Sequence, residues 1–268
     1  MLTLALPRLL TPGAGRRSVS MMERNVATLR GAYWIVFATG LLEPVLYLLS
    51  IGIGVGALVG DIALPDGRSV GYPSFVAPAM LAASAMTGAL AETTFNFYGK
   101  MKFMRLYDGI VATPVRPVEI AFGELTWAMI RGSVYSAAFL AIMVGMGLTT
   151  VGSALIALPA AILVGFAFGA AGLALSTFMR SWQDFDLMIS AQFALFLFSG
   201  TFVPAESYPA ALRWVVEATP LYRSVHLIRG ISLEMWSWVQ LLDVIYLLVL
   251  FAAGVAVAGR RMGLLLLK

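Results

Sequence analysis

Long apolar stretches, bounded by basic or aromatic residues, take up most of this chain of 268 residues. A helix needs roughly 17–25 such residues to cross a hydrocarbon core about 30 Å thick. The alternating pattern of a membrane β-barrel strand does not occur. The pattern therefore predicts an all-α polytopic membrane protein with six transmembrane helices. The predicted spans cover residues 32–59, 74–98, 120–148, 153–179, 187–203 and 238–258.

Composition agrees with a chain whose solvent is the bilayer. Hydrophobic residues make up 60% of the sequence and charged residues 12%, and the mean hydropathy is +0.88. Soluble domains are roughly half apolar and one-quarter charged. We expect residues 32–262 to form a single six-span domain, preceded by a cytoplasmic or interfacial segment, residues 1–31. An interfacial helix is expected near Ser20–Leu29, whereas a disordered tail is an equal alternative for residues 1–15.

The basic residues predict the orientation of the spans. An even number of spans places both termini on one side, and basic residues gather on the cytoplasmic side. We therefore expect both termini in the cytoplasm. The sequence pI of about 9.5 then reflects topology, so nucleic-acid binding is a poor explanation. The basic residues assigned to the cytoplasmic side are Arg8, Arg16, Arg17, Arg24, Arg30, Lys100, Lys102, Arg105, Arg116, Arg260, Arg261 and Lys268.

Of the five charged residues inside the predicted spans, three are expected to need a partner within the membrane: Glu43, Glu92 and Arg131. A charge near a helix centre costs about 2.5–3.5 kcal/mol on insertion scales, so pairing or a wet cavity is expected. Arg131 should therefore lie at salt-bridge distance from a carboxylate, either Glu43 or Glu92. The pair is either a structural clamp between helices or a polar contact on a substrate path. Glu124 and Asp243 lie nearer the span ends, where a charged side chain that snorkels toward water is less costly, and like His226 they receive no specific role.

About twenty residues separate the second and third spans, which is longer than a turn requires. Apolar Met101, Met104, Leu106 and Ile110 are expected on one side of a short helix. Basic and acidic side chains are expected on the other side, namely Lys102, Arg105 and Asp108. The segment is either a positive loop that only fixes orientation or a cytoplasmic knob that binds a soluble partner.

The segment after the fifth span predicts two short helices. Ser207 is expected to cap the first, which ends at Thr219-Pro220, and the second is expected over Leu221–Arg229. Neither helix is long enough to span a membrane. We expect a re-entrant hairpin dipping into the outer leaflet, a backbone that is tolerated only where protein or a cavity surrounds it.

Small residues recur at four-residue spacing in two spans. The first span has Gly52, Gly56 and Gly60, and the fourth has Ala161, Gly165 and Gly169. Such stripes let helix backbones approach closely. They indicate either packing within one subunit or a contact between two subunits.

Catalytic and metal-binding motifs are missing from the sequence. There is no phosphate-binding Gly-x-x-x-x-Gly-Lys-Ser/Thr, no His-Glu-x-x-His and no Gly-x-Ser-x-Gly, and there is no cysteine. We therefore expect a chain without its own catalytic, cofactor or metal site. If transport needs energy, another polypeptide must supply it.

Together these features resemble the permease subunits of the ABC-2 family of ATP-binding-cassette exporters. Within that family the chain is most similar to nodulation-factor and lipooligosaccharide exporter permeases. The family-level resemblance is carried by the six-span layout, the basic first cytoplasmic loop, and the stretches Phe198-Ser-Gly-Thr-Phe-Val-Pro204, Thr219-Pro-Leu-Tyr222 and Leu227-Ile-Arg-Gly230. The closer resemblance is carried by Leu42-Glu-Pro-Val-Leu-Tyr47, Tyr72-Pro-Ser-Phe-Val-Ala-Pro78 and Gly123-Glu-Leu-Thr-Trp-Ala128.

The resemblance implies a transport subunit in the bacterial plasma (inner) membrane. It pairs with a second permease subunit, usually an identical one, and with two copies of a cytoplasmic ABC ATPase that bind ATP and magnesium. The ATPase-coupling residues would be Lys102, Arg105, Leu106, Tyr107 and Asp108. The external gate would include Phe202, Pro204, Trp214, Pro220 and Tyr222.

The substrate stays open at this point. A glycolipid or lipooligosaccharide and a hydrophobic drug in efflux both fit an amphipathic export path in contact with membrane lipid. The main alternative is an ion-coupled secondary transporter or channel, which often shows inverted repeats. A membrane scaffold or an intramembrane enzyme is a third class.

Overall fold

The computed structural model describes residues 42, 45–46, 48–64, 67–111, 115 and 117–266. Within these residues the chain is mostly helical, and it has one pair of short strands. The longer helices are α5 (Tyr72–Leu90), α7 (Pro117–Gly145), α8 (Val151–Ser176), α9 (Gln183–Leu197) and α12 (Trp238–Leu266). The shorter elements are η2 (Leu48–Val55), α4 (Gly56–Val59), β1 (Asp61–Ala63), β2 (Ser69–Gly71), η3 (Ala91–Asn96), η4 (Gly99–Phe103), α6 (Leu106–Val111), η5 (Ala205–Ser207), α10 (Ala210–Ala218) and α11 (Pro220–Ser232).

Four helical runs are long and apolar enough to cross a membrane in the described part of the chain. They correspond to the predicted second, third, fourth and sixth spans, and their bounds are Tyr72–Phe103, Glu119–Gly145, Val151–Ser176 and Trp238–Leu265. The first of these joins α5 to η3 and η4, two turns of wider, π-helical backbone. The chain is therefore a helical membrane protein, while the count of six spans stays a prediction.

The remaining two predicted spans are seen in part. Helix continues from Leu48 to Val59 at the end of the first span, and the earlier part of that span lies largely outside the described residues. The interfacial helix expected at Ser20–Leu29 lies outside them entirely. In the fifth span, α9 begins four residues before the predicted start and ends at Leu197 rather than Val203. It ends early because the backbone leaves the helical region at Phe198, with a φ of −100° and a ψ of 31°, and Gly200 follows with a positive φ of 68°.

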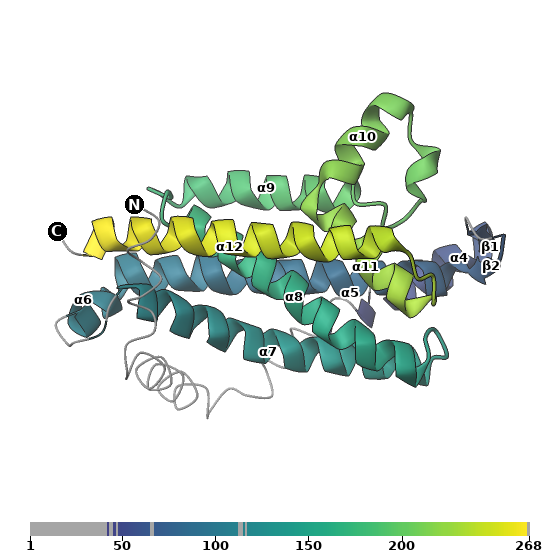
Figure 1. Cartoon of the computed structure of the whole chain (residues 1–268), viewed down its shortest axis with the longest axis horizontal. Helices are drawn as coiled ribbons and strands as arrows, with labels where there is room; N and C mark the ends of the chain where they lie inside the picture. The colour runs from purple at the N-terminus through teal and green to yellow at the C-terminus, as the bar shows by residue number, and fades with distance from the viewer. Residues whose placement is uncertain are drawn as a thin grey trace.

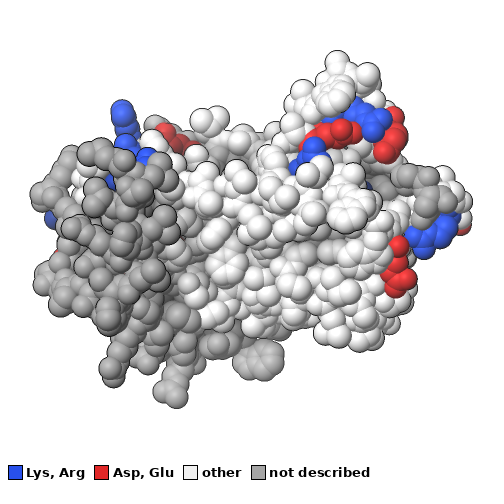
Figure 2. Space-filling view, in the orientation of Figure 1, with Lys and Arg blue, Asp and Glu red and all other residues white. Residues whose placement is uncertain are grey.

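The long helices run along one axis of the molecule (Figure 1). The α6 helix and the end of α12 lie at one end, which we call the α6 end, and α10, α11 and the β1–β2 hairpin lie at the other, the α10 end. The charged side chains visible on this face of the described part gather at these two ends, and the visible surface between them is uncharged (Figure 2). This distribution fits a bilayer around the middle of the molecule.

Close backbone approach holds α8 at the centre of the bundle, where it packs against α5, α7 and α12. A Cβ built on Gly169 would lie 2.8 Å from a Leu125 methyl, and one on Gly254 would lie 2.6 Å from the Ala170 backbone. For the fourth-span stripe, packing within the subunit is therefore confirmed. In the first span, Gly56 lies against Pro73.

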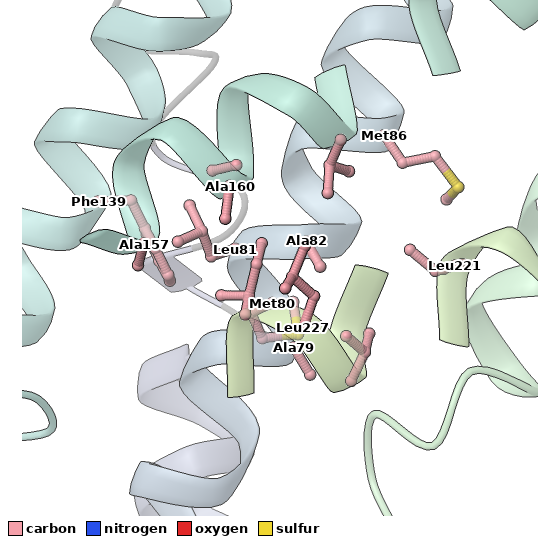
Figure 3. Close-up of a cluster of buried hydrophobic side chains, with 14 of the residues drawn as sticks. Ala79, Met80, Leu81, Ala82, Met86, Phe139, Ala157, Ala160, Leu221 and Leu227 are labelled. Carbon is pink, nitrogen blue, oxygen red and sulfur yellow. The ribbon is translucent and has the colours of Figure 1, made fainter. Parts of the chain in front are cut away.

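The two short helices predicted before the last span are present, and they differ in burial. Helix α11 contributes Leu221 and Leu227 to a core formed with α5, α7 and α8 (Figure 3). Helix α10 projects from the body, and Trp214 is 76% exposed. The prediction that Ser207 caps the first helix was wrong: Ser207 ends η5, and Pro209 occupies the N-cap position. Whether either helix enters the bilayer stays a prediction.

Candidate functional site

The predicted coupling segment lies at the α6 end as two separate pieces. The helix from α5 continues to Phe103, then Arg105 takes a positive φ of 45° and α6 begins at Leu106. Because of this break, the prediction that Met101 and Met104 share one apolar face was wrong. Met101 is buried, whereas Met104 is 73% exposed.

The break leaves charged side chains outside and one aromatic residue inside. Lys102, Arg105 and Asp108 are exposed, and Leu106 is half-buried. Tyr107 is fully buried, and its ring stacks on Phe97 at 5.2 Å between centroids. Tyr107 therefore anchors α6 to the bundle, where it packs among residues of α7, α8 and α12. It cannot present its ring to a partner protein as a coupling residue would.

Aromatic side chains connect this segment to the start of α9. Phe103 stacks on Trp182 with ring centroids 5.3 Å apart and an interplanar angle of 20°. Trp182 also contacts Phe95 and Phe185, at 4.9 and 5.3 Å. The sequence analysis missed this cluster. The signal was available in Trp182 and Phe185, two aromatic residues in a short polar connection between spans.

Two ion pairs connect the α6-end half of the α5–η4 run to α7. Arg131 pairs with Glu92, one of the two carboxylates expected for it, and Asn96 donates to Glu92 at 2.8 Å. Lys100 pairs with Glu124 at 2.6 Å, and Glu124 is buried. Glu43 lies outside the described residues. Glu124 was expected near a span end without a role, but it is half of a buried pair.

A cavity of about 290 Å³ lies beside the Arg131–Glu92 pair, between α5, α7, α8 and α9. Ala91 and Gly132 line it, and they are the chain neighbours of Glu92 and Arg131. Its polar lining includes Thr87 and Gln192, which hydrogen-bond across α5 and α9 at 3.1 Å. This cavity was not predicted from the sequence, because many of its lining residues are small ones of the kind that usually mark close packing.

At the α10 end, the predicted gate residues are held in different ways. Phe202 packs edge-on against Phe196 with centroids 5.3 Å apart, and its carbonyl accepts a bond from the Tyr72 hydroxyl at 3.3 Å. The Tyr222 ring packs against the turn, since a Cβ built on Gly200 would lie 3.4 Å from it. Pro220 is the first residue of α11 and Pro204 caps η5.

Trp214 lies apart from this group, on the exposed face of α10. Its neighbour Arg213 forms a surface pair with Glu217 at 2.6 Å, and this hydrogen bond raises the pKa of Arg213. The structure therefore gathers Phe202 and Tyr222 around one turn, the Phe198–Val203 turn, and leaves Trp214 outside it.

Arg229 holds this turn in place. It donates to the carbonyls of Gly200 at 2.9 Å and Phe75 at 3.1 Å, and its guanidinium lies 3.7 Å from the centre of the Phe75 ring. A single side chain of α11 thus ties the Phe198–Val203 turn to α5. Arg229 belongs to one of the sequence stretches quoted above, but no role was predicted for it.

A second polar cluster joins α11 to α12. The Asp243 carboxylate is fully buried and lies 2.5 Å from His226 Nδ1 and 3.2 Å from Arg223 Nη1. The expectation that Asp243 reaches solvent near a span end was wrong, because it points inward at α11. Arg223 and His226 are three residues apart, so they share one face of α11. That shared face, together with a carboxylate inside the next predicted span, is the sequence signal that was overlooked.

A family model described as ABC-2 type transporter matches residues 18–233, which is most of the chain. The chain belongs to the ABC-2 type transporter family. Among curated relatives, nodulation protein J of Rhizobium leguminosarum bv. trifolii is 30% identical over 223 residues, which cover 83% of each chain. The same protein from Rhizobium leguminosarum bv. viciae is 29% identical over 256 residues, covering 94% of this chain and 97% of the relative. Nodulation protein J of Rhizobium meliloti is 30% identical over 83% of each chain.

Membership in the ABC-2 family indicates what kind of protein these sites belong to. The chain is a multi-pass membrane protein and a permease subunit of an ABC exporter, and such a subunit works with an ABC ATPase. The resemblance stated from the sequence is therefore confirmed at the family level, including its similarity to nodulation proteins.

Proposed function

We propose that this ABC-2 permease carries an amphipathic substrate outward through the bacterial inner membrane, using ATP hydrolysed by a separate ATPase. The chain itself contributes no catalytic site. ATP and magnesium bind to two ATPase copies at the α6 end, two permease subunits form the pore as a homodimer, and both termini lie in the cytoplasm.

The observation that carries this proposal is the construction of the α6 end. In this segment, the charged side chains of Lys102, Arg105 and Asp108 are exposed, and the side chain of Tyr107 is buried in the bundle. Exposed charged side chains on a segment that is anchored in the bundle suit docking to a soluble protein. A movement of the docked protein would be transmitted through Tyr107 to the helices that hold it.

The relatives support a substrate class. The curated relatives named above are nodulation proteins, and an exporter of lipooligosaccharides or related glycolipids is the function that fits the resemblance stated from the sequence. A hydrophobic drug is the second substrate class. Both are amphipathic, and both need a path that meets hydrocarbon as well as water.

The test separates docking from folding. In proteoliposomes containing the permease and its ATPase, Lys102→Glu combined with Arg105→Glu should lower ATP-driven glycolipid export and the binding of the ATPase. The buried Tyr107 is left intact, so the subunit should still insert and fold. Arg213→Glu, a charge reversal at an exposed residue of the α10 end, serves as the control and should leave ATPase binding unchanged.

Two results would contradict the proposal. One is normal ATPase binding and export by the Lys102/Arg105 variant. The other is transport that continues without ATPase and follows an ion gradient, which would favour the secondary transporter or channel instead.

A further inference from the structure

The cavity between α5, α7, α8 and α9 has room for a hydrocarbon chain. Its volume is about 290 Å³. At the roughly 30 Å³ that a water molecule occupies in the liquid, this is room for about ten groups of methylene size. The volume lies at the lower end of the range of about 300 to 1,000 Å³ for pockets that hold drug-sized molecules. A single hydrocarbon chain therefore fits, and it would fill the cavity.

The chemistry of the walls also favours a hydrocarbon. Among the described lining residues none is charged, and most are Ala, Gly, Met, Ile or Phe. Three of the polar side chains on the wall already bond to the protein: Gln192 donates to Thr87 at 3.1 Å, and Ser133 donates to the Met129 carbonyl at 2.7 Å. A sugar would have to break these bonds, whereas a hydrocarbon leaves them in place.

One wall can admit a chain sideways. Ile189 and Phe193 of α9 line the cavity, and yet they are 59% and 58% exposed. The helix α9 therefore forms a thin wall between the cavity and the outer surface of the subunit. The Arg131–Glu92 pair, with side chains 17% and 18% exposed, lies beside the cavity on the α5 and α7 side. It offers charged hydrogen-bonding groups to a polar part held outside.

We propose that this cavity binds the hydrocarbon chain of the exported amphiphile, while the polar part stays outside beside the Arg131–Glu92 pair. The inference rests on the proposed function, because it assumes that an amphiphile is the cargo. It adds the place where the apolar part sits, which is inside one subunit.

Two glycines allow the cavity to be filled without disturbing its walls. Gly132 on α7 and Gly88 on α5 line the cavity, and a Cβ built on either would meet no atom within 4 Å. Gly132→Leu and Gly88→Leu should each lower affinity for the chain about tenfold, the effect of losing contact with about two methylene groups. Gly145→Leu is the matched control: Gly145 lies on α7 with equally open surroundings but outside the cavity.

The experiment uses the full chain in lipid nanodiscs and a fatty-acylated monosaccharide with a diazirine at the chain end. We expect crosslinks on cavity residues of α5 and α9, reduced by both filling variants and unchanged by Gly145→Leu. A phosphatidylglycerol with the same diazirine chain should label the cavity less than the glycolipid does. Leu155 on α8, which is 68% exposed, lies outside the cavity lining and reports labelling by bulk lipid.

Three results would overturn the inference: labelling confined to outward-facing residues such as Leu155, labelling insensitive to both filling variants, or equal cavity labelling by phosphatidylglycerol. ATP-driven export, measured on the same protein with its ATPase, keeps the two proposals apart. Export without cavity labelling removes only this inference. Cavity labelling without ATP-driven export removes the proposed function, and the cavity then remains a chain-binding site whose ligand is not exported cargo.

Discussion

Replacing Asp243 by Asn should destabilise the packing of α11 on α12 more than any surface charge change. The carboxylate is fully buried, pairs with the Arg223 guanidinium and contacts the His226 imidazole, and these two side chains are 28% and 35% exposed. Asn keeps the volume but removes the negative charge. In the variant Arg223 stays charged, but the carboxylate that balances this charge in the wild-type protein is gone.

The magnitude follows from how far these partners can reach water. Breaking a fully buried ion pair by removing one partner costs about 3–5 kcal/mol. Arg223 and His226 are partly exposed and recover some hydration, so we expect about 2–3 kcal/mol. For a chain of this size, each kcal/mol lowers the melting temperature by roughly 2–4 °C, so the apparent melting temperature should fall by about 4–12 °C.

The assay is thermal unfolding of the purified permease in detergent, followed by tryptophan fluorescence. Glu217→Gln, which removes the carboxylate of the exposed Arg213–Glu217 pair, is the control and should shift the melting temperature much less. The reasoning is wrong if the two variants melt at the same temperature. It is also wrong if Asp243→Asn alone melts at the wild-type temperature.

Three further predictions concern close packing and fixed hydrogen bonds. Gly254→Ala should lower the melting temperature, since its methyl group would lie 2.6 Å from the Ala170 backbone and overpacking typically costs about 1–3 kcal/mol. Gly145→Ala should leave the melting temperature unchanged, and equal melting temperatures of the two variants would contradict the prediction. Arg229→Lys should loosen the Phe198–Val203 turn, because an ammonium cannot reproduce the forked bonds to separate carbonyls; faster hydrogen exchange in that turn would support this, and unchanged exchange would refute it. Tyr107→Ala should cost about 3–5 kcal/mol of folding free energy in detergent unfolding, as for other large buried aromatic residues, so a wild-type unfolding curve would show that α6 is not anchored by this ring.

Hydropathy alone predicted the elements whose whole length is apolar. The second, third, fourth and sixth spans begin and end within a few residues of their predicted bounds, except that α12 continues to Leu266. Hydropathy works here because a spanning helix must satisfy its backbone internally and cover it with apolar side chains. Sequence also predicted the break at Thr219-Pro220, because Pro ends one helix and begins the next.

Side-chain direction was harder to predict than helix position. Asp243 and Glu124 were read as reaching toward a span end, yet both point inward to a cation on another helix. Met104 and Met101 were read on one face, and the positive φ at Arg105 separates them. In each case the deciding contact comes from a segment distant in sequence or from one unusual backbone angle. Neither leaves a periodic signal in the chain.

The cavity was also out of reach of prediction from the sequence, for a different reason. Ala and Gly on neighbouring helices predict close approach, and they do pack closely around Gly169 and Gly254. The same residue types around Gly88 and Gly132 line open space. Whether a small side chain ends in contact or in a hollow depends on the tilt of the partner helix, which composition does not specify.

The stacked rings of Phe103 and Trp182 connect the α6 end directly to α9. Phe103 ends the long helix of α5 beside α6, and Trp182 immediately precedes α9. Two stacked aromatic planes resist compression but slide easily past one another. In the proposed exporter, a movement of the ATPase that presses α6 along the helix axes would be transmitted to α9, while a sideways movement would be lost as the rings slide. Because Ile189 and Phe193 of α9 line the cavity, the transmitted movement would change the width of the cavity. The ATPase and the hydrocarbon part of the substrate would then be separated by only one helix.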